Sequence, residues 1–291
     1  MRLDQETIER LIAGVEAAGR EVMAIYRRGF AVEHKVDESP LTEADMAAHH
    51  ALLALLEHAT PGVPVLSEES GEIPFATRGG WSRYWLVDPL DGTREFIAGN
   101  GEFTLNLALV EDGVPVFGIV HAPALPEGAV TWWGHVEKGA FRREIAGEGA
   151  RPSTGSRDWP IRVRALPNPD CEPWQVVGSR RNGQAAFEAF CQALPTHATQ
   201  SIGSSLKFCL VAEGKADLYP RLAPTYEWDT AAAQAIVTAA GGQVLEAETL
   251  QPLCCNQTES LLNPGFIACG QRDPRWERAL AEALDAATSR R

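Results

Sequence analysis

The chain has 291 residues and a formal net charge of −13, with 45% hydrophobic and 22% charged residues. These proportions are ordinary for a globular protein, and the length allows one large domain or two. This net charge argues against a nucleic-acid polymer as partner, because such a partner needs a basic face. A small phosphorylated substrate needs only a few local cations, so it remains a possible partner.

The six cysteines show no Cys-x-x-Cys spacing, which indicates reduced thiols rather than a disulfide framework. The N-terminal residues contain no apolar signal-peptide segment, and no apolar run is long enough to cross a membrane. We therefore expect a cytoplasmic protein that is a monomer or a homodimer. Peripheral association with the inner membrane is not excluded.

The first half of the chain predicts two helices and then a series of strands. Apolar residues recur at helical spacing over residues 3–28, and Thr42-x-x-Asp45 is a capping-box pattern that begins a second helix ending near His58. The connection over residues 33–40 is polar. Apolar runs predict strands over residues 65–66, 84–87, 103–110, 114–120 and 129–133.

The second half of the chain alternates strands with helices, which is typical of an α/β half that follows an α+β half. Strands are predicted over residues 175–178, near 199, and over 216–219, 244–245 and 266–269, and helices over 184–194, 204–213, 229–240 and 276–287. Residues 144–158 are rich in Gly, Ser, Arg and Pro, which predicts an exposed loop. We therefore expect domains over residues 1–155 and 156–291.

The stretch Trp85-Leu-Val-Asp-Pro-Leu-Asp-Gly-Thr93 presents two carboxylates at the end of a buried strand. Pro89 stops regular strand pairing after Asp88, and Gly92 permits a tight turn beyond Asp91. Two carboxylates that converge are stable when a cation lies between them, and hard oxygen ligands suit Mg²⁺ or Mn²⁺. A surface turn explains the isolated motif equally well.

Two further motifs accompany this stretch, Ser67-Glu-Glu-Ser70 upstream and Trp228-Asp-Thr-Ala-Ala-Ala233 downstream. In this order the three resemble the signature of the inositol monophosphatase superfamily of Mg²⁺-dependent, lithium-sensitive phosphomonoesterases. Within it the chain is most similar to the CysQ-type 3'(2'),5'-bisphosphate nucleotidases, through residues 63–69, 83–93, 100–104, 201–214 and 263–266. The resemblance implies a layered αβαβα sandwich, of the type shared with fructose-1,6-bisphosphatase.

The resemblance also implies a set of oxygen ligands for two or three Mg²⁺ ions, with Mn²⁺ as a possible substitute. The implied ligands are Glu68, Asp88, Asp91, Asp229 and the backbone carbonyl of Leu90. Such ions neutralise phosphate oxygens, lower the pKa of a bound water and stabilise the leaving alkoxide. Without the resemblance, Glu68 is explained by a solvated acidic loop and Asp229 by capping of its helix.

The same resemblance implies that Asp45 hydrogen-bonds Thr93, and that this pair and Glu68 prepare the attacking water. Capping of its own helix is sufficient by itself to explain Asp45. We expect the two roles of Asp45 to coexist only if the side chain points away from its helix terminus. Lys35 matches a lysine that lies near the metals in the family.

Substrate contacts are expected from Gly92 and Thr93 and from the second half of the chain. Gly203-Ser204-Ser205 opens a helix, whose free N–H groups and two hydroxyls form a phosphate seat, and Lys207 and Arg221 add positive charge. Simple N-capping and a solvated lysine are the alternatives. A second anion seat favours a bisphosphate, and Glu227 is expected to add a charge near the nucleotide.

The leading hypothesis is hydrolysis of the 3'-phosphate of adenosine 3',5'-bisphosphate to AMP and phosphate, with the 5'-phosphosulfate form as a further substrate. Attack is expected from metal-activated water without a phosphoenzyme, and the resemblance implies clearance of a by-product of sulfate assimilation. An inositol-1-phosphate or other sugar-phosphate phosphatase is the alternative enzyme. A non-catalytic phosphonucleotide-binding protein predicts a missing ligand or a missing Thr93, and none is missing.

Overall fold

The computed structural model describes residues 3–34, 40–145, 157–180 and 184–288. Its helices are α1 (Gln5–Arg28), α2 (Glu43–Ala59), α3 (Phe75–Arg78), α4 (Thr93–Ala98), α5 (Gln184–Ala193), α6 (Leu206–Ala212), α7 (Glu227–Ala239) and α8 (Pro274–Thr288). A seven-stranded sheet contains, in spatial order, β3 (Val65–Ser67), β4 (Arg83–Asp91), β5 (Thr104–Glu111), β6 (Val114–Ala122), β7 (Ala129–His135), β8 (Gly139–Ile145) and β9 (Asp158–Ile161). A five-stranded sheet contains β11 (His197–Ser201), β10 (Trp174–Gly178), β12 (Leu218–Arg221), β14 (Phe266–Cys269) and β13 (Gln243–Glu246), and β1 (Val32–His34) pairs with β2 (Pro40–Thr42).

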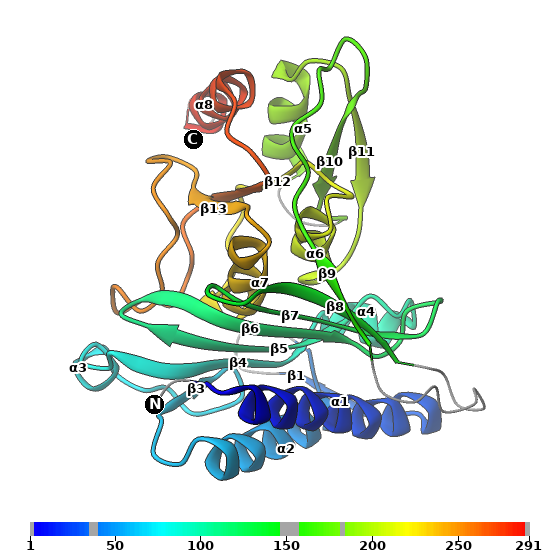
Figure 1. Ribbon diagram of the computed structural model, residues 1–291, viewed down its shortest axis with the longest axis vertical. Helices are drawn as coiled ribbons and strands as arrows, with labels where there is room; N and C mark the ends of the chain where they lie inside the picture. The colour runs from blue at the N-terminus through cyan, green and yellow to red at the C-terminus, as the bar shows by residue number, and fades with distance from the viewer. Residues whose placement is uncertain (1–2, 35–39, 146–156, 181–183, 289–291) are drawn as a thin grey trace.

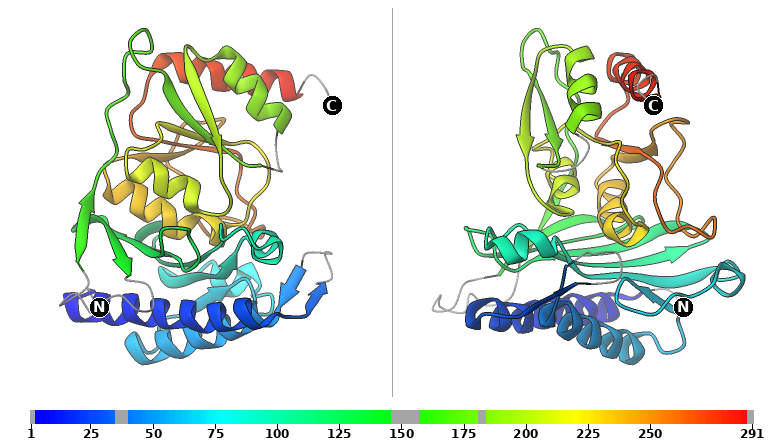
Figure 2. Two further views of the ribbon diagram at one scale, coloured as in Figure 1. Left: turned by 90° about the vertical axis from the view of Figure 1, so that its right-hand side faces the viewer. Right: turned by 180° about the vertical axis from the view of Figure 1, so that it is seen from behind.

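These elements stack in five layers (Figure 1). Helices α1 and α2 cover the outer face of the seven-stranded sheet, and α6 and α7 lie between this sheet and the five-stranded one. Helices α5 and α8 cover the far face of the five-stranded sheet. The views from the side and from behind show the same order, with α1 and α2 at one end (Figure 2). The predicted αβαβα sandwich is therefore confirmed.

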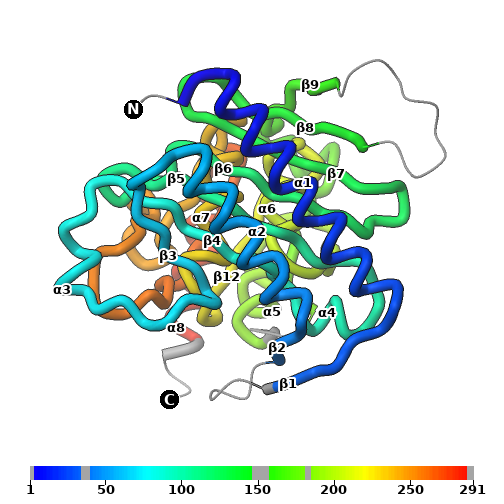
Figure 3. The backbone as a smooth tube through the Cα atoms, turned by 90° about the horizontal axis from the view of Figure 1, so that it is seen from below, coloured from blue at the N-terminus to red at the C-terminus, as the bar shows by residue number. Residues whose placement is uncertain are grey.

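The first layer forms because α1 and α2 each present an apolar face to the sheet. Asp4 caps α1 by accepting a hydrogen bond of 2.8 Å from the N–H of Thr7. The helical spacing seen in the sequence places the buried side chains of α1 on one face. The two helices run side by side beneath the sheet (Figure 3).

Strand β4 is buried on both faces, which explains its continuous apolar run. Tyr84 and Leu86 pack toward α6 and α7, whereas Trp85 and Val87 pack toward α1 and α2. The strand was expected to end at Asp88, but it continues to Asp91 with a bulge between these two residues. Proline cannot donate a ladder hydrogen bond, and the bulge accommodates it. Gly92, with φ at +92°, then turns the chain into α4, a helix that the sequence did not predict.

Helix α7 packs directly against the backbone of the seven-stranded sheet because two facing strand positions are glycine. A Cβ atom added to Gly118 would lie 2.0 Å from the carbonyl oxygen of Ala232, and one added to Gly134 would lie 2.9 Å from the Cα of Ile236. No side chain fits at either position without moving the helix backbone. The two glycines therefore set the height of α7 above the sheet.

Most other predicted elements are confirmed, with local differences. Residues 33–40 were expected to be a simple polar connection, but their described ends form the β1–β2 pair. Strands β8 and β9 were not expected, and their pairing extends the first sheet to Ile161, beyond the expected boundary at residue 155. The loop residues 146–156 lie outside the described residues, and the division into two domains stays a prediction. All six cysteines are free, and no described helix is long and apolar enough to span a membrane.

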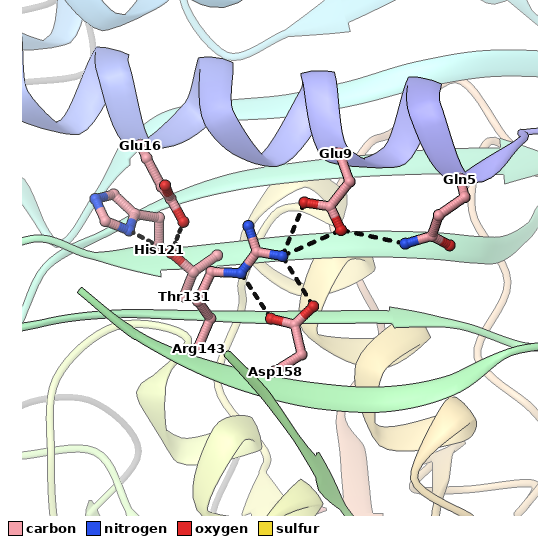
Figure 4. A network of polar contacts seen from close by, with 7 residues as sticks. All are labelled: Gln5, Glu9, Glu16, His121, Thr131, Arg143 and Asp158. Carbon is pink, nitrogen blue, oxygen red and sulfur yellow. Dashed lines mark hydrogen bonds and ion pairs between the residues drawn. The ribbon is translucent and has the colours of Figure 1, made fainter. Parts of the chain in front are cut away.

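A polar network joins α1 to strands β7, β8 and β9 (Figure 4). Arg143 donates to both carboxylate oxygens of Asp158, at 2.6 and 2.8 Å, and to Glu9 at 2.9 Å. Beside it, the Nδ1 of buried His121 lies 2.9 Å from the hydroxyl of Thr131, which donates to Glu16 at 3.2 Å. Burial lowers the pKa of His121 to about 4, because the charged imidazolium loses its hydration.

His121 should make the fold sensitive to acid. Its pKa is about 4 in the folded chain and about 6.5 when unfolded, so between these values the unfolded state binds more protons. Stability contributed by neutral His121 is complete above about pH 6.5 and is lost as the pH falls toward 4, at a total cost of about 3 kcal/mol. In His121→Asn, whose amide can still bond Thr131, urea denaturation across this range should show a smaller acid loss. Glu16, whose pKa burial raises, is present in both proteins and cancels in the comparison. Equal acid losses in both proteins would contradict the assignment.

Candidate active site

Three carboxylates from three separate elements meet at one end of β4. Glu68 follows β3, Asp88 lies in β4 and Asp229 lies in the first turn of α7; one oxygen of each falls within 4.8 Å of the others. The parallel pairing of β3 with β4 brings Glu68 beside Asp88, and the N–H of Glu68 donates to the carbonyl of Val87 at 3.1 Å. The cluster joins both halves of the chain.

The cluster is electrostatically unfavourable without a cation. Asp88 is 1% exposed; its Oδ1 accepts from the N–H of Leu90 at 3.0 Å, and its Oδ2 has no hydrogen-bond partner among the described residues. Burial, followed by the charges of Glu68, Asp91 and Asp229, raises the pKa of Asp88 well above its usual value. Burial and neighbouring carboxylates do the same to the pKa of Asp229. An unpartnered buried oxygen among converging carboxylates fits a hard divalent cation.

Asp91 lies beside the cluster but turns one oxygen toward the second half of the chain. Its Oδ2 accepts from the N–H of Ser205 at 2.6 Å. Burial raises the pKa of Asp91 to about 6, and the charge of Lys207 and the Ser205 hydrogen bond oppose that rise. The expected ligand role of Asp91 stays a prediction, as does that of the Leu90 carbonyl.

Asp45 caps its own helix and contacts Thr93 at the same time. Its Oδ2 accepts from the N–H and the hydroxyl of Thr42, at 2.8 and 2.6 Å, and its Oδ1 accepts from the hydroxyl of Thr93 at 3.3 Å. The expectation that both contacts require the side chain to turn away from the helix is therefore wrong, because each carboxylate oxygen serves one of them. Burial raises the pKa of Asp45 to about 6, which suits a group that exchanges protons near neutral pH.

Glu227 does not add a charge to the nucleotide seat, contrary to expectation. It is 4% exposed, and its two carboxylate oxygens accept from the N–H of Asn256 at 2.8 and 2.9 Å. The side chain of Asn256 in turn exchanges hydrogen bonds with fully buried Arg78. This chain of contacts anchors the first turn of α7, the turn that carries Asp229.

The segment from Gly203 to Ser205 is less open to an anion than the sequence suggested. The N–H of Gly203 donates to Glu102 at 2.7 Å, and the N–H of Ser205 donates to Asp91. The hydroxyl of Ser205 lies 2.9 Å from the amide oxygen of Asn106 and donates to it. The hydroxyl of Ser204, at a residue with φ of +45°, has no partner in the described parts of the chain. Tertiary contacts have thus taken two of the N–H groups that were expected to be free.

A cavity of about 190 Å³ opens beside Asp91 and Asp229. Of the expected substrate residues it is lined by Gly92, Gly203, Ser204, Ser205, Lys207 and Arg221. Thr93 does not line it. Lys35 lies outside the described residues.

The cavity also contains side chains that the sequence analysis missed, among them Arg94, Ser179 and Arg180. Two signals could have identified them. Arg94 directly follows the central motif, and Ser179 and Arg180 follow a predicted parallel strand at its carboxyl end, where ligands bind in α/β sheets.

The comparisons with known proteins agree with this geometry. The family model of the inositol monophosphatase family matches residues 4–289. This chain belongs to the inositol monophosphatase family. It is 45% identical over 251 residues to the 3'(2'),5'-bisphosphate nucleotidase CysQ of Escherichia coli (strain K12), covering 86% of this chain and 94% of that one. It is 32% identical over 277 residues to CysQ of Haemophilus influenzae, covering 95% and 97%.

Solved structures in the family share the fold. CysQ from Bacteroides thetaiotaomicron superposes with a TM-score of 0.76 and 37% identity, covering 92% of this chain and 98% of that one. An inositol monophosphatase from Thermotoga maritima superposes with a TM-score of 0.71 and 25% identity, covering 97% and 99%. The Bacteroides protein is described as a bacterial member of the inositol monophosphatase family.

Replacing Asp88 by Asn should stabilise the metal-free protein. The change removes a buried charge that its neighbours repel, and the new amide can donate to their carboxylates. We expect the melting temperature of chelator-treated Asp88→Asn to exceed that of the wild type by a few degrees. Mg²⁺ should raise the wild-type value more than the variant's, because ligand binding to the folded state stabilises it.

A matched control is Asp217→Asn. Asp217 is also buried, but it pairs with Arg164 at 2.7 and 2.6 Å, so its replacement should lower the melting temperature. A metal-free Asp88→Asn protein that melts below the wild type would contradict the repulsion described above.

The two contacts of Asp45 predict different results for two substitutions. Asp45→Asn leaves only one oxygen acceptor for the two contacts, so it should lower the melting temperature by weakening the capping box and also lower kcat. Thr93→Val removes only the hydroxyl, so kcat should fall about 100-fold or more with little change in melting temperature. A stable, fully active Asp45→Asn protein would exclude both roles.

Proposed function

We propose that this chain is a phosphoric monoester hydrolase of the cytoplasm that removes the 3'-phosphate of adenosine 3',5'-bisphosphate, giving AMP and phosphate. The observation that carries the proposal is a cavity lined by both acidic and basic side chains. Asp91 and Asp229 line it, and so do Lys207 and Arg221. Such a cavity suits a substrate with two phosphates, one beside a metal and one beside cations. The relatives named CysQ support this choice of substrate.

The carboxylates of Glu68, Asp88 and Asp229 would hold the metal, joined by Asp91 and the carbonyl of Leu90. Mg²⁺, when bound, would neutralise the phosphate oxygens and lower the pKa of the attacking water. The number of ions that we propose is two or three, and Mn²⁺ is the proposed substitute. The unpartnered Oδ2 of Asp88 supports the assignment.

Thr93 and Asp45 would move the proton of the attacking water. The hydroxyl of Thr93 donates to Asp45, so its oxygen is free to accept a hydrogen bond from that water. As the water attacks phosphorus in line, its proton passes to Thr93, and the hydroxyl proton of Thr93 passes to Asp45. The P–O bond to the 3'-oxygen breaks in the same displacement, the leaving oxygen takes a proton from solvent to give the 3'-hydroxyl of AMP, and no phosphoenzyme forms.

Lys207 and Arg221 would supply positive potential beneath the second phosphate. Burial lowers the pKa of Lys207 to about 8, and Asp91 opposes that decrease. Lys207 therefore stays largely protonated at neutral pH. In the cell, the reaction would clear a by-product of sulfate assimilation, and the corresponding 5'-phosphosulfate would be a further substrate.

Phosphate release from adenosine 3',5'-bisphosphate tests the proposal directly. We expect release with Mg²⁺, loss of release with a chelator and a decrease on addition of Li⁺. Asp91→Asn should remain folded and lose turnover, because one carboxylate fewer weakens metal binding. Faster release from inositol 1-phosphate would replace the nucleotide assignment by the alternative enzyme class. Absence of release from both substrates would refute the hydrolase.

A further inference from the structure

Four basic side chains line the cavity, and three of them already have protein partners. The ammonium of Lys207 donates to the carbonyls of Ile202, at 3.2 Å, and Ser204. Arg221 donates to the carbonyl of Pro224 at 3.1 Å. Arg180 pairs with Glu102, whose other oxygen holds the N–H of Gly203.

Arg94 is the fourth basic residue, and it has no such protein partner among the described residues. Its side chain is exposed, and it makes no hydrogen bond or ion pair with any described residue. The acidic side chain nearest to it in sequence, Glu95, also lines the cavity without pairing with it. All the donors of its guanidinium group are therefore available to a ligand.

The position of Arg94 in the chain brings it close to the reaction. It directly follows Thr93 in α4, and successive residues of a helix point in directions about 100° apart. Thr93 faces Asp45, whereas Arg94 faces the cavity. Thr93, the residue proposed to contact the attacking water, and the unpaired guanidinium of Arg94 are thus adjacent along the backbone. This arrangement fits a small substrate with a second anionic group.

We propose that Arg94 determines specificity for a bisphosphate by binding the phosphate that is not cleaved. The inference rests on the proposed function. A guanidinium group pairs with a phosphate through two parallel hydrogen bonds. Lys207 and Arg180 would each have to give up a protein partner to bind the phosphate as fully. The Nε of Arg221 has no partner within the described residues, but Arg221 is buried and bonded to Pro224 through Nη2, whereas the exposed Arg94 loses only water.

The test compares two nucleotides that differ in a single phosphate, adenosine 3',5'-bisphosphate and adenosine 3'-monophosphate. The measured quantity is the ratio of kcat/KM for the first to that for the second. In Arg94→Gln this ratio should fall about 10- to 100-fold, because charge-assisted hydrogen bonds to the second phosphate are lost. The change should appear mainly in KM for the bisphosphate. Arg94→Lys should give an intermediate ratio, since it keeps the charge but not the paired geometry.

Arg278→Gln is the matched control. Arg278 is also exposed, has no partner among the described residues and lies on α8, outside the cavity. The control removes the same charge, so it should leave the ratio and the activity unchanged. An unchanged ratio in Arg94→Gln, or an equal loss for both substrates, would overturn the inference.

Equilibrium binding separates this inference from the proposed hydrolysis. AMP keeps the uncleaved phosphate and adenosine lacks it, and both can be titrated by calorimetry with no turnover. Wild type should bind AMP more tightly than adenosine, and Arg94→Gln should lose that preference. A retained preference would overturn the role of Arg94 even if hydrolysis were established. Absence of hydrolysis by the wild type would overturn the proposed function alone.

Discussion

Repulsion among buried carboxylates is the constraint on which the rest of the structure depends. Asp88, Asp229 and Glu68 would separate if they lay on mobile loops, because like charges in a poorly hydrated place repel strongly. They are held together because Glu68 and Asp88 are attached to neighbouring strands of the seven-stranded sheet and Asp229 to helix α7, which packs on that sheet. Apolar packing on both faces of β4 and the close contact of α7 with the sheet hold these elements in place against the repulsion between the carboxylates.

In each aspartate of the site, one carboxylate oxygen accepts a hydrogen bond from the protein. One oxygen binds nearby protein groups: Thr42 for Asp45, the N–H of Leu90 for Asp88, that of Ser205 for Asp91 and that of Tyr226 for Asp229. These bonds fix the orientation of each carboxylate and satisfy local backbone donors. The second oxygen of Asp88 has no partner among the described residues, and that of Asp45 accepts from Thr93. One side chain can therefore both cap a helix and take part in the site. That a residue such as Asp45 caps its helix does not exclude a catalytic role.

The sequence was sufficient for most helices and strands, because these depend on apolar periodicity. The layered fold and the clustering of Glu68, Asp88 and Asp229 were implied by the family resemblance that its local motifs carry. The sequence was insufficient where a group's partner comes from a distant segment. The N–H of Gly203 meets Glu102, and Glu227 turns toward Asn256, for reasons that no local pattern contains. Strand β9 was missed because it is only four residues long and contains Pro160, which is unusual in a strand, and it is recognised only by its pairing with β8.

Gly118 and Gly134 lie on the face of the sheet hidden beneath α7, away from the cavity. The distance between α7 and the sheet, and with it the distance between Asp229 and Asp88, therefore depends on the absence of a side chain at these two positions. Even one added methyl group would act as a wedge, lifting α7 and carrying Asp229 away from Asp88. In a survey of random substitutions, some inactivating changes should therefore fall at the contact between α7 and these two glycines. The affected proteins would retain every residue that touches metal or substrate.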